Sequence, residues 1–237
     1  MSVYLYAVTA AGHPHRLDGL HGVGDPAGAL RSLRARSVAA VVSDAPAELR
    51  AKRRDLMAHE NVQERLLEDG AVLPMRFGLV AGSDDEVLAA LDEHAAAYEQ
   101  ALREVEGCTE YHLRVARDED DMLREIVTQS DEARKLNDRT RQDPASHADK
   151  VALGELISHE IERRRERAAE DVVHALSDTA VRHVVGQPNR DHLVALSFLV
   201  RRERSGDFSR AAQHLADDLG AGAQLTLHGP LPPYSFV

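Results

Sequence analysis

One short segment of the chain has residues of the types that bind zinc and hydrolyse peptides. The order His59-Glu60-Asn61-Val62-Gln63 resembles a helical motif in which two histidines four residues apart hold zinc and a glutamate acts as general base. Gln63 stands where the second histidine is required, so the site lacks a ligand. We therefore interpret His59 as a hydrogen-bonded residue of a core or domain interface.

The other candidate sites are also incomplete. The segment Gly22 to Ala27 superficially fits a dinucleotide-binding loop, but it lies well downstream of the first predicted strand and contains Pro26. His13 and His15 are spaced to hold only an adventitious metal ion in a loop, and Cys108 has no basic residue beside it in the sequence. We predict no catalytic residues, no cofactor, no metal site and no enzymatic activity.

The charge balance argues against a nucleic-acid partner. Lys and Arg number 29 against 40 Asp and Glu, which gives a net charge of −11, and this charge opposes binding to phosphate backbones. The basic runs 163–167 and 201–204 are interrupted by glutamates, so we interpret them as salt-bridged surface.

Cysteine content and hydropathy indicate the compartment. A single cysteine cannot form an internal disulfide, which suits a reducing cytosol. The chain begins with an alternating strand pattern, with no basic leader before an apolar run, and no stretch is long and apolar enough to span a bilayer. We expect a cytoplasmic protein with no membrane partner.

The elements that would position these residues alternate in type through the first half. We predict strands at 3–8, 38–43 and 71–75, a short helix at 27–36, and a helix that begins near Asp44 and ends at Gly70 in a left-handed cap. Arg76-Phe77-Gly78 should form a turn. Ser83 and Glu86 form a capping box, and one helix should run from there to Gly107.

The second half predicts a strand at 109–116, a charged insertion at 118–146 of exposed short helix and loop, and a long helix capped by Ser146. Strands at 181–185 and 193–200 should flank a turn at 186–189, and a helix at 206–219 should precede a last strand at 224–227. This order is the split βαβ arrangement of a ferredoxin-like domain.

We therefore predict an α+β fold with two domains. Residues 1–106 would form a modified ferredoxin-like or open α/β domain. Residues 107–237 would form a ferredoxin-like domain with the long helix, the charged insertion and a C-terminal tail at 230–237.

Two sequence blocks carry a family resemblance. The first is a helix with His59-Glu60 followed by Leu-Pro-x-Arg-Phe-Gly at 73–78, and the second is Gly-Pro-Leu-Pro-Pro-Tyr-Ser-Phe at 229–236. Together they resemble the gas vesicle protein F/L family, whose members typically end in Gly-Pro-Trp-Pro-Pro-Tyr-Ser-Phe. Leu231 stands at the tryptophan position, which leaves open the role that an indole would have there.

The resemblance implies a non-enzymatic, gas vesicle-associated accessory protein that binds the small hydrophobic shell protein during nucleation or growth, alone or with other accessory proteins. It also implies two α+β domains with a ferredoxin-like C-terminal half. The candidate partner-contact or interdomain residues are His59, Glu60, Arg76, Phe77, Tyr234 and Phe236. An alternative function is a small-molecule-sensing ferredoxin-like regulatory module.

Overall fold

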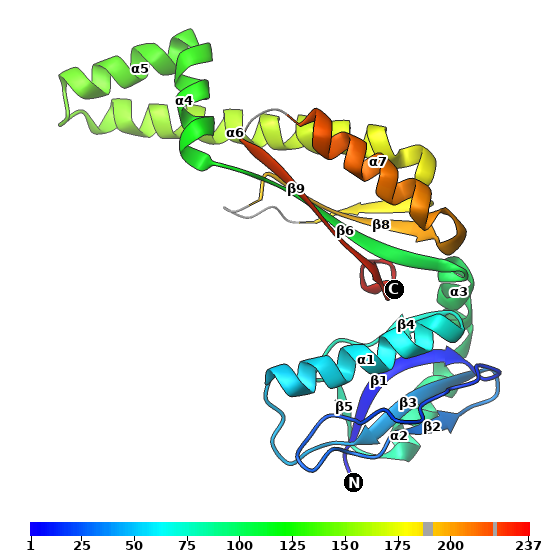
Figure 1. Cartoon of the computed structure of the whole chain (residues 1–237). Helices are drawn as coiled ribbons and strands as arrows, with labels where there is room; N and C mark the ends of the chain where they lie inside the picture. The colour runs from blue at the N-terminus through cyan, green and yellow to red at the C-terminus, as the bar shows by residue number, and fades with distance from the viewer. Residues whose placement is uncertain (187–191, 220–221) are drawn as a thin grey trace. The chain divides into compact units, whose positions relative to one another are not determined.

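The computed structural model describes residues 1–186, 192–219 and 222–237. Backbone contacts divide the chain into two compact units (Figure 1). The first unit comprises Met1–Tyr111, Leu199–Glu203 and Gly229–Val237, and the second comprises His112–Phe198 and Arg204–His228. The C-terminal residues therefore group with the first unit, while the predicted domains 1–106 and 107–237 remain a prediction.

An antiparallel sheet is the centre of the first unit. Its strands are β1 (Val3–Ala10), β2 (Arg31–Arg34), β3 (Val38–Asp44), β4 (Val72–Pro74) and β5 (Val80–Ala81). The order is β2-β3-β1-β4, and β5 pairs with the end of β1 that β4 leaves free. Antiparallel pairing excludes the parallel sheet of an open α/β domain for this unit.

Both faces of this sheet are covered by helices, which are α1 (Arg53–Asp69), α2 (Asp84–Glu93) and α3 (Ala95–Val105). Helix α1 packs on the face that carries Tyr4 and Tyr6, and α2 and α3 pack on the face that carries Val3 and Val8. A register shift between Leu5 and Ala7 places Tyr6 and Ala7 on the same face. Strand β3 is buried along nearly its whole length, which confirms its predicted central position.

Several predicted elements of the first unit were wrong. The segment 27–36 contains strand β2 and no helix, because Arg31 to Arg34 pair with Ala39 to Val42. Helix α1 begins at Arg53 rather than near Asp44, and the single helix expected before Gly107 is divided into α2 and α3 at His94. Ser83 is confirmed as the N-cap, since its Oγ accepts from the Glu86 N–H, whereas the Glu86 carboxylate accepts from the Gly82 N–H and not from that of Ser83 as a full capping box requires.

Gly70 ends α1 as predicted, but its φ of 173° is extended and not left-handed. Its glycine identity has a different cause. A Cβ at this position would lie 2.9 Å from His13 Cδ2, so a side chain would displace the histidine.

The second sheet has the strand order β7-β8-β6-β9. Its strands are β6 (Cys108–Arg117), β7 (Arg182–Val185), β8 (Val194–Arg201) and β9 (Ala223–Leu231), with helices α4 (Glu119–Gln129), α5 (Asp131–Gln142), α6 (His147–Leu176) and α7 (Ser205–Asp218). With β6 counted as the first strand, the order is 4-1-3-2, as the split βαβ topology requires. The α+β class is therefore confirmed.

The segment between β6 and α6 is more regular than predicted. Residues 118–146 form the two helices α4 and α5, which bury Met122, Ile126, Ala133 and Leu136, rather than a short helix and loop. The Ser146 cap of α6 is confirmed, since its Oγ accepts from the Asp149 N–H. In the second unit Phe198 of β8 packs against Phe208 of α7 with ring centroids 5.3 Å apart. The turn predicted at 186–189 extends into residues outside the described part.

Candidate functional site

Helix α1 places His59 against β1 and the end of β4. The Nε2–H of His59 donates to the Met75 carbonyl at 3.0 Å, and Nδ1 lies 2.9 Å from the Tyr4 hydroxyl. A carbonyl can only accept, so Nδ1 is the unprotonated nitrogen and Tyr4 donates to it. The Tyr4 oxygen in turn accepts from the Gly78 N–H at 3.2 Å. Burial lowers the pKa of His59, which keeps the imidazole neutral.

Gln63, one turn further along α1, connects three parts of the first unit. Its side-chain N–H groups donate to the carbonyls of Tyr6, at 2.6 Å, and Met75, at 2.9 Å. Its Oε1 accepts from the Tyr234 hydroxyl. The residue that breaks the zinc motif is therefore fully buried and has partners for both ends of its amide.

The C-terminal tail is held within the first unit by three consecutive residues. Phe236 is 7% exposed and belongs to the apolar cluster that contains Val3 and Val8. Ser235 donates to the buried carboxylate of Glu110, through its N–H to Oε2 at 2.8 Å and through its hydroxyl to Oε1 at 2.5 Å. Burial raises the pKa of Tyr234 to about 12, so its phenol stays protonated and able to donate to Gln63.

The segment from Arg76 to Val80 has a fixed backbone and exposed side chains. The Leu5 N–H donates to the Leu79 carbonyl at 3.0 Å, and Val80 pairs with Tyr4 in the sheet. The Leu79 and Val80 residues are 44% and 43% exposed. Phe77 is half-buried, and its ring centroid lies 5.6 Å from that of the buried His59. We call residues 76–80 the apolar turn.

The structure brings three of the six candidate residues into one contact network, since His59 and Phe77 touch directly and Tyr234 reaches them through Gln63. Phe236 anchors the same tail in the apolar cluster on the opposite face of the sheet. Glu60 and Arg76 are exposed. Whether these residues contact a partner remains a prediction.

Four residues of this network were missed from the sequence: Tyr4, Gln63, Glu110 and Ser235. Tyr4 and Tyr6 follow strand alternation, and Gln63 follows the helical spacing of His59, so each matches the pattern of an ordinary core position. The contacts of Tyr4 with His59 and of Gln63 with Tyr234 join residues 55 and 171 positions apart. No local spacing predicts such contacts.

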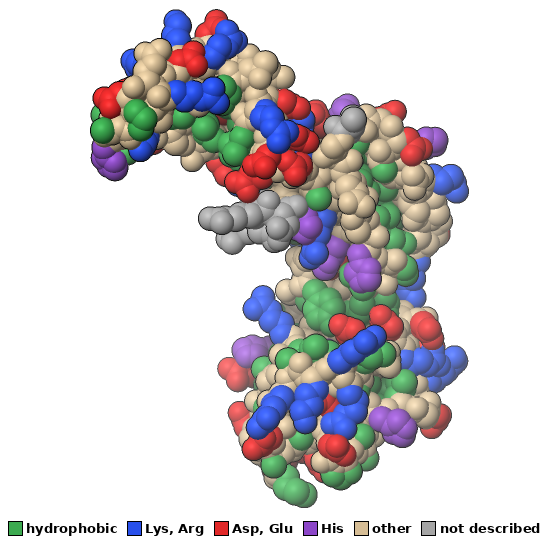
Figure 2. All heavy atoms as spheres, turned by 60° about the vertical axis from the view of Figure 1, so that its left-hand side comes forward, with side chains coloured by type: hydrophobic (Ala, Val, Ile, Leu, Met, Phe, Trp, Pro, Cys, Tyr) green, Lys and Arg blue, Asp and Glu red, His purple; other side chains and the backbone are tan. Residues whose placement is uncertain are grey.

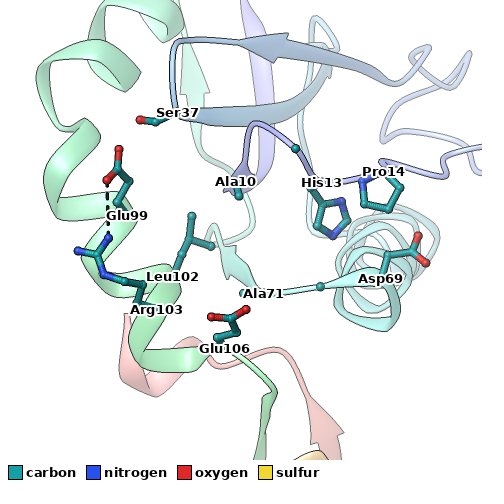
Figure 3. Close-up of a pocket in the computed structure, with 12 residues that line it drawn as sticks. Ala10, His13, Pro14, Ser37, Asp69, Ala71, Glu99, Leu102, Arg103 and Glu106 are labelled. Carbon is teal, nitrogen blue, oxygen red and sulfur yellow. Dashed lines mark ion pairs between the residues drawn. The ribbon is translucent and has the colours of Figure 1, made fainter.

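A cavity of about 410 Å³ opens in the first unit beside the C-terminal end of α1 (Figure 3). Its lining includes the apolar Ala10, Ala71 and Leu102 and the carboxylates of Asp69, Glu99 and Glu106. Arg103, its one guanidinium, lies 3.6 Å from Glu99, as Figure 3 shows. The cavity is thus acidic around an apolar wall, and His13 and Ser37 also line it.

The two loop histidines use their ring nitrogens within the protein. His13 Nε2 donates to the Leu66 carbonyl, and its Nδ1 accepts from the His15 N–H. His15 contacts the Thr9 and Ser32 hydroxyls. Within residues 1–186, 192–219 and 222–237, no three His, Cys, Asp or Glu side chains are grouped to hold a metal ion. Among the same residues, no helix combines the length and the apolar character that a bilayer span needs.

Comparisons with known proteins identify the family. The family model for gas vesicle synthesis protein GvpL/GvpF matches residues 2–237. Gas vesicle protein F of Streptomyces sp. (strain CB03234) is 38% identical over 238 residues, covering 100% of both chains, and that of Dolichospermum flosaquae is 23% identical over 79% of this chain and 78% of its own. The crystal structure of GvpF from Microcystis aeruginosa shares the fold with a TM-score of 0.84, at 21% identity over 99% of this chain and 98% of that one. The chain belongs to the gas vesicle synthesis protein GvpL/GvpF family.

Proposed function

We propose that this protein is a non-catalytic accessory protein that binds the small hydrophobic shell protein of the gas vesicle during nucleation or growth. Membership of the family gives the chain a role in gas vesicle formation. The observation that supports shell binding is the apolar turn, which exposes Leu79 and Val80 on a backbone held to β1. A surface that is already ordered loses little conformational entropy when an apolar partner binds.

The network beneath the apolar turn explains why it can serve as a docking surface. The Gly78 N–H donates to the Tyr4 hydroxyl, and this hydroxyl donates in turn to His59, a buried residue of α1. Gln63 then connects this assembly to the C-terminal tail. In this proposal the two sequence blocks of the family are supports for a contact surface, and His59 and Tyr234 act by positioning residues 76–80.

The surface charge suits a protein that handles an apolar partner. Acidic and basic side chains are interspersed on the face shown in Figure 2, and the net charge is −11. Net charge of this size favours solubility of a complex whose partner has apolar surface. The partners proposed are the shell protein and other gas vesicle accessory proteins, in the cytoplasm and at the vesicle, with no nucleic acid or membrane.

Crosslinking mass spectrometry of the protein with its shell partner tests this assignment. Crosslinkers that react with aliphatic C–H bonds should attach the shell protein to residues 76–80. Crosslinks confined to the second unit would contradict the assignment of the apolar turn.

A second candidate function, a small-molecule-sensing module, is favoured by the cavity beside α1. Its size suits a small ligand, and its carboxylates favour a cation with an apolar body. A screen of small amines by thermal shift distinguishes the two. A ligand whose stabilising effect disappears in Glu106→Gln would support sensing, and no shift with any amine would count against it.

A further inference from the structure

A groove of about 570 Å³ runs between α5 and α6 in the second unit. Its lining residues come from both helices: Glu132, Lys135, Leu136, Arg139, Ala152, Glu155, Leu156 and His159. On each helix the positions follow the spacing i, i+3, i+4 and i+7. Each helix therefore presents one continuous face over two turns, and two such faces side by side form the seat in which a third helix packs.

Helix α6 has apolar side chains along this groove that its neighbours only partly cover. Val172 and Leu176, near its C-terminal end, are its buried residues. Of its residues that line the groove, Ala152 and Leu156 are only half-buried. Helix α4 meets α6 further along, where Arg164 contacts Glu125 at 3.0 Å and Gln129 at 2.8 Å. The groove segment of α6 is thus covered on one side by α5.

The two walls of the groove differ in charge. Lys135 and Arg139 lie on the α5 wall and are exposed, with Glu132 at the end of that wall. Arg139 lies 3.0 Å from Asp149 at the start of α6. The α6 wall carries Glu155. A helix that complements both walls needs an apolar stripe, acidic residues on the flank toward α5 and a basic residue on the flank toward α6.

We propose that the α5–α6 groove docks an amphipathic helix of a partner protein, whose acidic flank lies along Lys135 and Arg139. The proposal rests on the proposed function, in which the protein works by binding other gas vesicle proteins, and gives it a second contact surface of defined chemistry. Leu136, Ala152 and Leu156 form the apolar floor. Because the two walls differ in charge, they favour one orientation of the bound helix over the reverse orientation.

The test uses two synthetic helical peptides of about 18 residues, or five turns, with the same apolar stripe. In the first peptide, glutamates lie on the flank meant to face α5 and lysines on the flank meant to face α6. In the second peptide, these charges are exchanged. The full-length protein should bind the first peptide more tightly in fluorescence anisotropy. Lys135→Glu should weaken that binding about tenfold and improve binding of the exchanged peptide, and Ala152→Trp, which fills the groove, should weaken both about tenfold.

Lys150→Glu, on an exposed position of α6 outside the groove lining, is the matched control and should leave both affinities unchanged. Circular dichroism of each variant establishes that it is folded. Equal binding of the two peptides, or binding insensitive to Lys135→Glu and Ala152→Trp, would overturn the proposal. Self-association of the wild type that Ala152→Trp abolishes would also overturn it, because the occupant would then be a second copy. Co-purification of the shell protein tests the proposed function separately, because the shell protein can be retained or lost whether or not the peptides bind to the groove.

Discussion

The hydroxyl of Tyr234 donates to Oε1 of Gln63, so a residue three positions from the chain end is tied to the middle of α1. The same amide donates to β1 and to the residue after β4. A single side chain therefore couples the C-terminal tail to the support of the apolar turn.

Replacing Gln63 should destabilise the protein strongly. Gln63→Leu keeps the approximate volume but leaves the Tyr6 and Met75 carbonyls and the Tyr234 hydroxyl without this partner. Loss of several buried hydrogen bonds should lower the free energy of unfolding by about 2–4 kcal/mol in urea titrations. The exposed neighbour Glu64→Gln is the control and should change it by less than about 0.5 kcal/mol. Equal stability of Gln63→Leu and the wild type would contradict the network.

Each residue of the C-terminal tail should contribute to the free energy of unfolding according to the contacts that it makes. Tyr234→Phe removes one hydrogen bond and should cost about 1 kcal/mol, whereas Phe236→Ala opens a cavity in an apolar cluster and should cost about 3–5 kcal/mol. Val237→Ala, at an exposed position, should be nearly neutral. Because Gln63 and Tyr234 touch, Gln63→Leu with Tyr234→Phe should cost less than the sum of the single changes. Strict additivity would show that the contact contributes nothing.

Stability should fall in mild acid. Burial lowers the pKa of His59 and His13 below the ordinary 6.5, and burial with the nearby charges of His13 and Arg34 lowers that of His15 to about 4. Below pH 6.5 the unfolded chain binds protons that the folded chain does not, so the free energy of unfolding decreases as the pH falls from about 6.5 toward 4. Urea titrations across this range measure the slope.

His15→Gln isolates one of these groups, since its amide can still bond to the Thr9 and Ser32 hydroxyls. This variant should show a shallower slope than the wild type between pH 6.5 and 4. A slope as steep as that of the wild type would mean that His15 titrates normally in the folded protein.

The sequence predicted elements well where the local signals agreed. Ser83 and Ser146 each begin a helix as their capping patterns require, and β1 and β3 follow their apolar patterns. Prediction failed at 27–36, where Leu30 and Leu33 recur at a spacing of three residues that suits a helix, but pairing with β3 decides for the strand. It failed again at His94, where the apolar stripe continues in sequence but the helix is interrupted.

The candidate site was only partly predictable for a related reason. His59 was identifiable because its spacing placed it on the apolar stripe of a helix beside a turn. Its partner Tyr4 lies 55 positions away in β1, and the hydrogen bonds between Ser235 and Glu110 join positions 125 apart. Long-range hydrogen bonds of this kind depend on how the sheet and helices pack, which periodicity does not encode.

Co-purification of the shell protein with variants of the apolar turn tests shell binding most directly. Leu79→Asp combined with Val80→Asp changes exposed side chains and should leave the fold intact, and Val181→Asp, 45% exposed in the second unit, is the matched control. The wild type and Val181→Asp should retain the shell protein equally, and the turn variant should retain at least about tenfold less. Equal retention by the folded turn variant and the wild type would contradict the account.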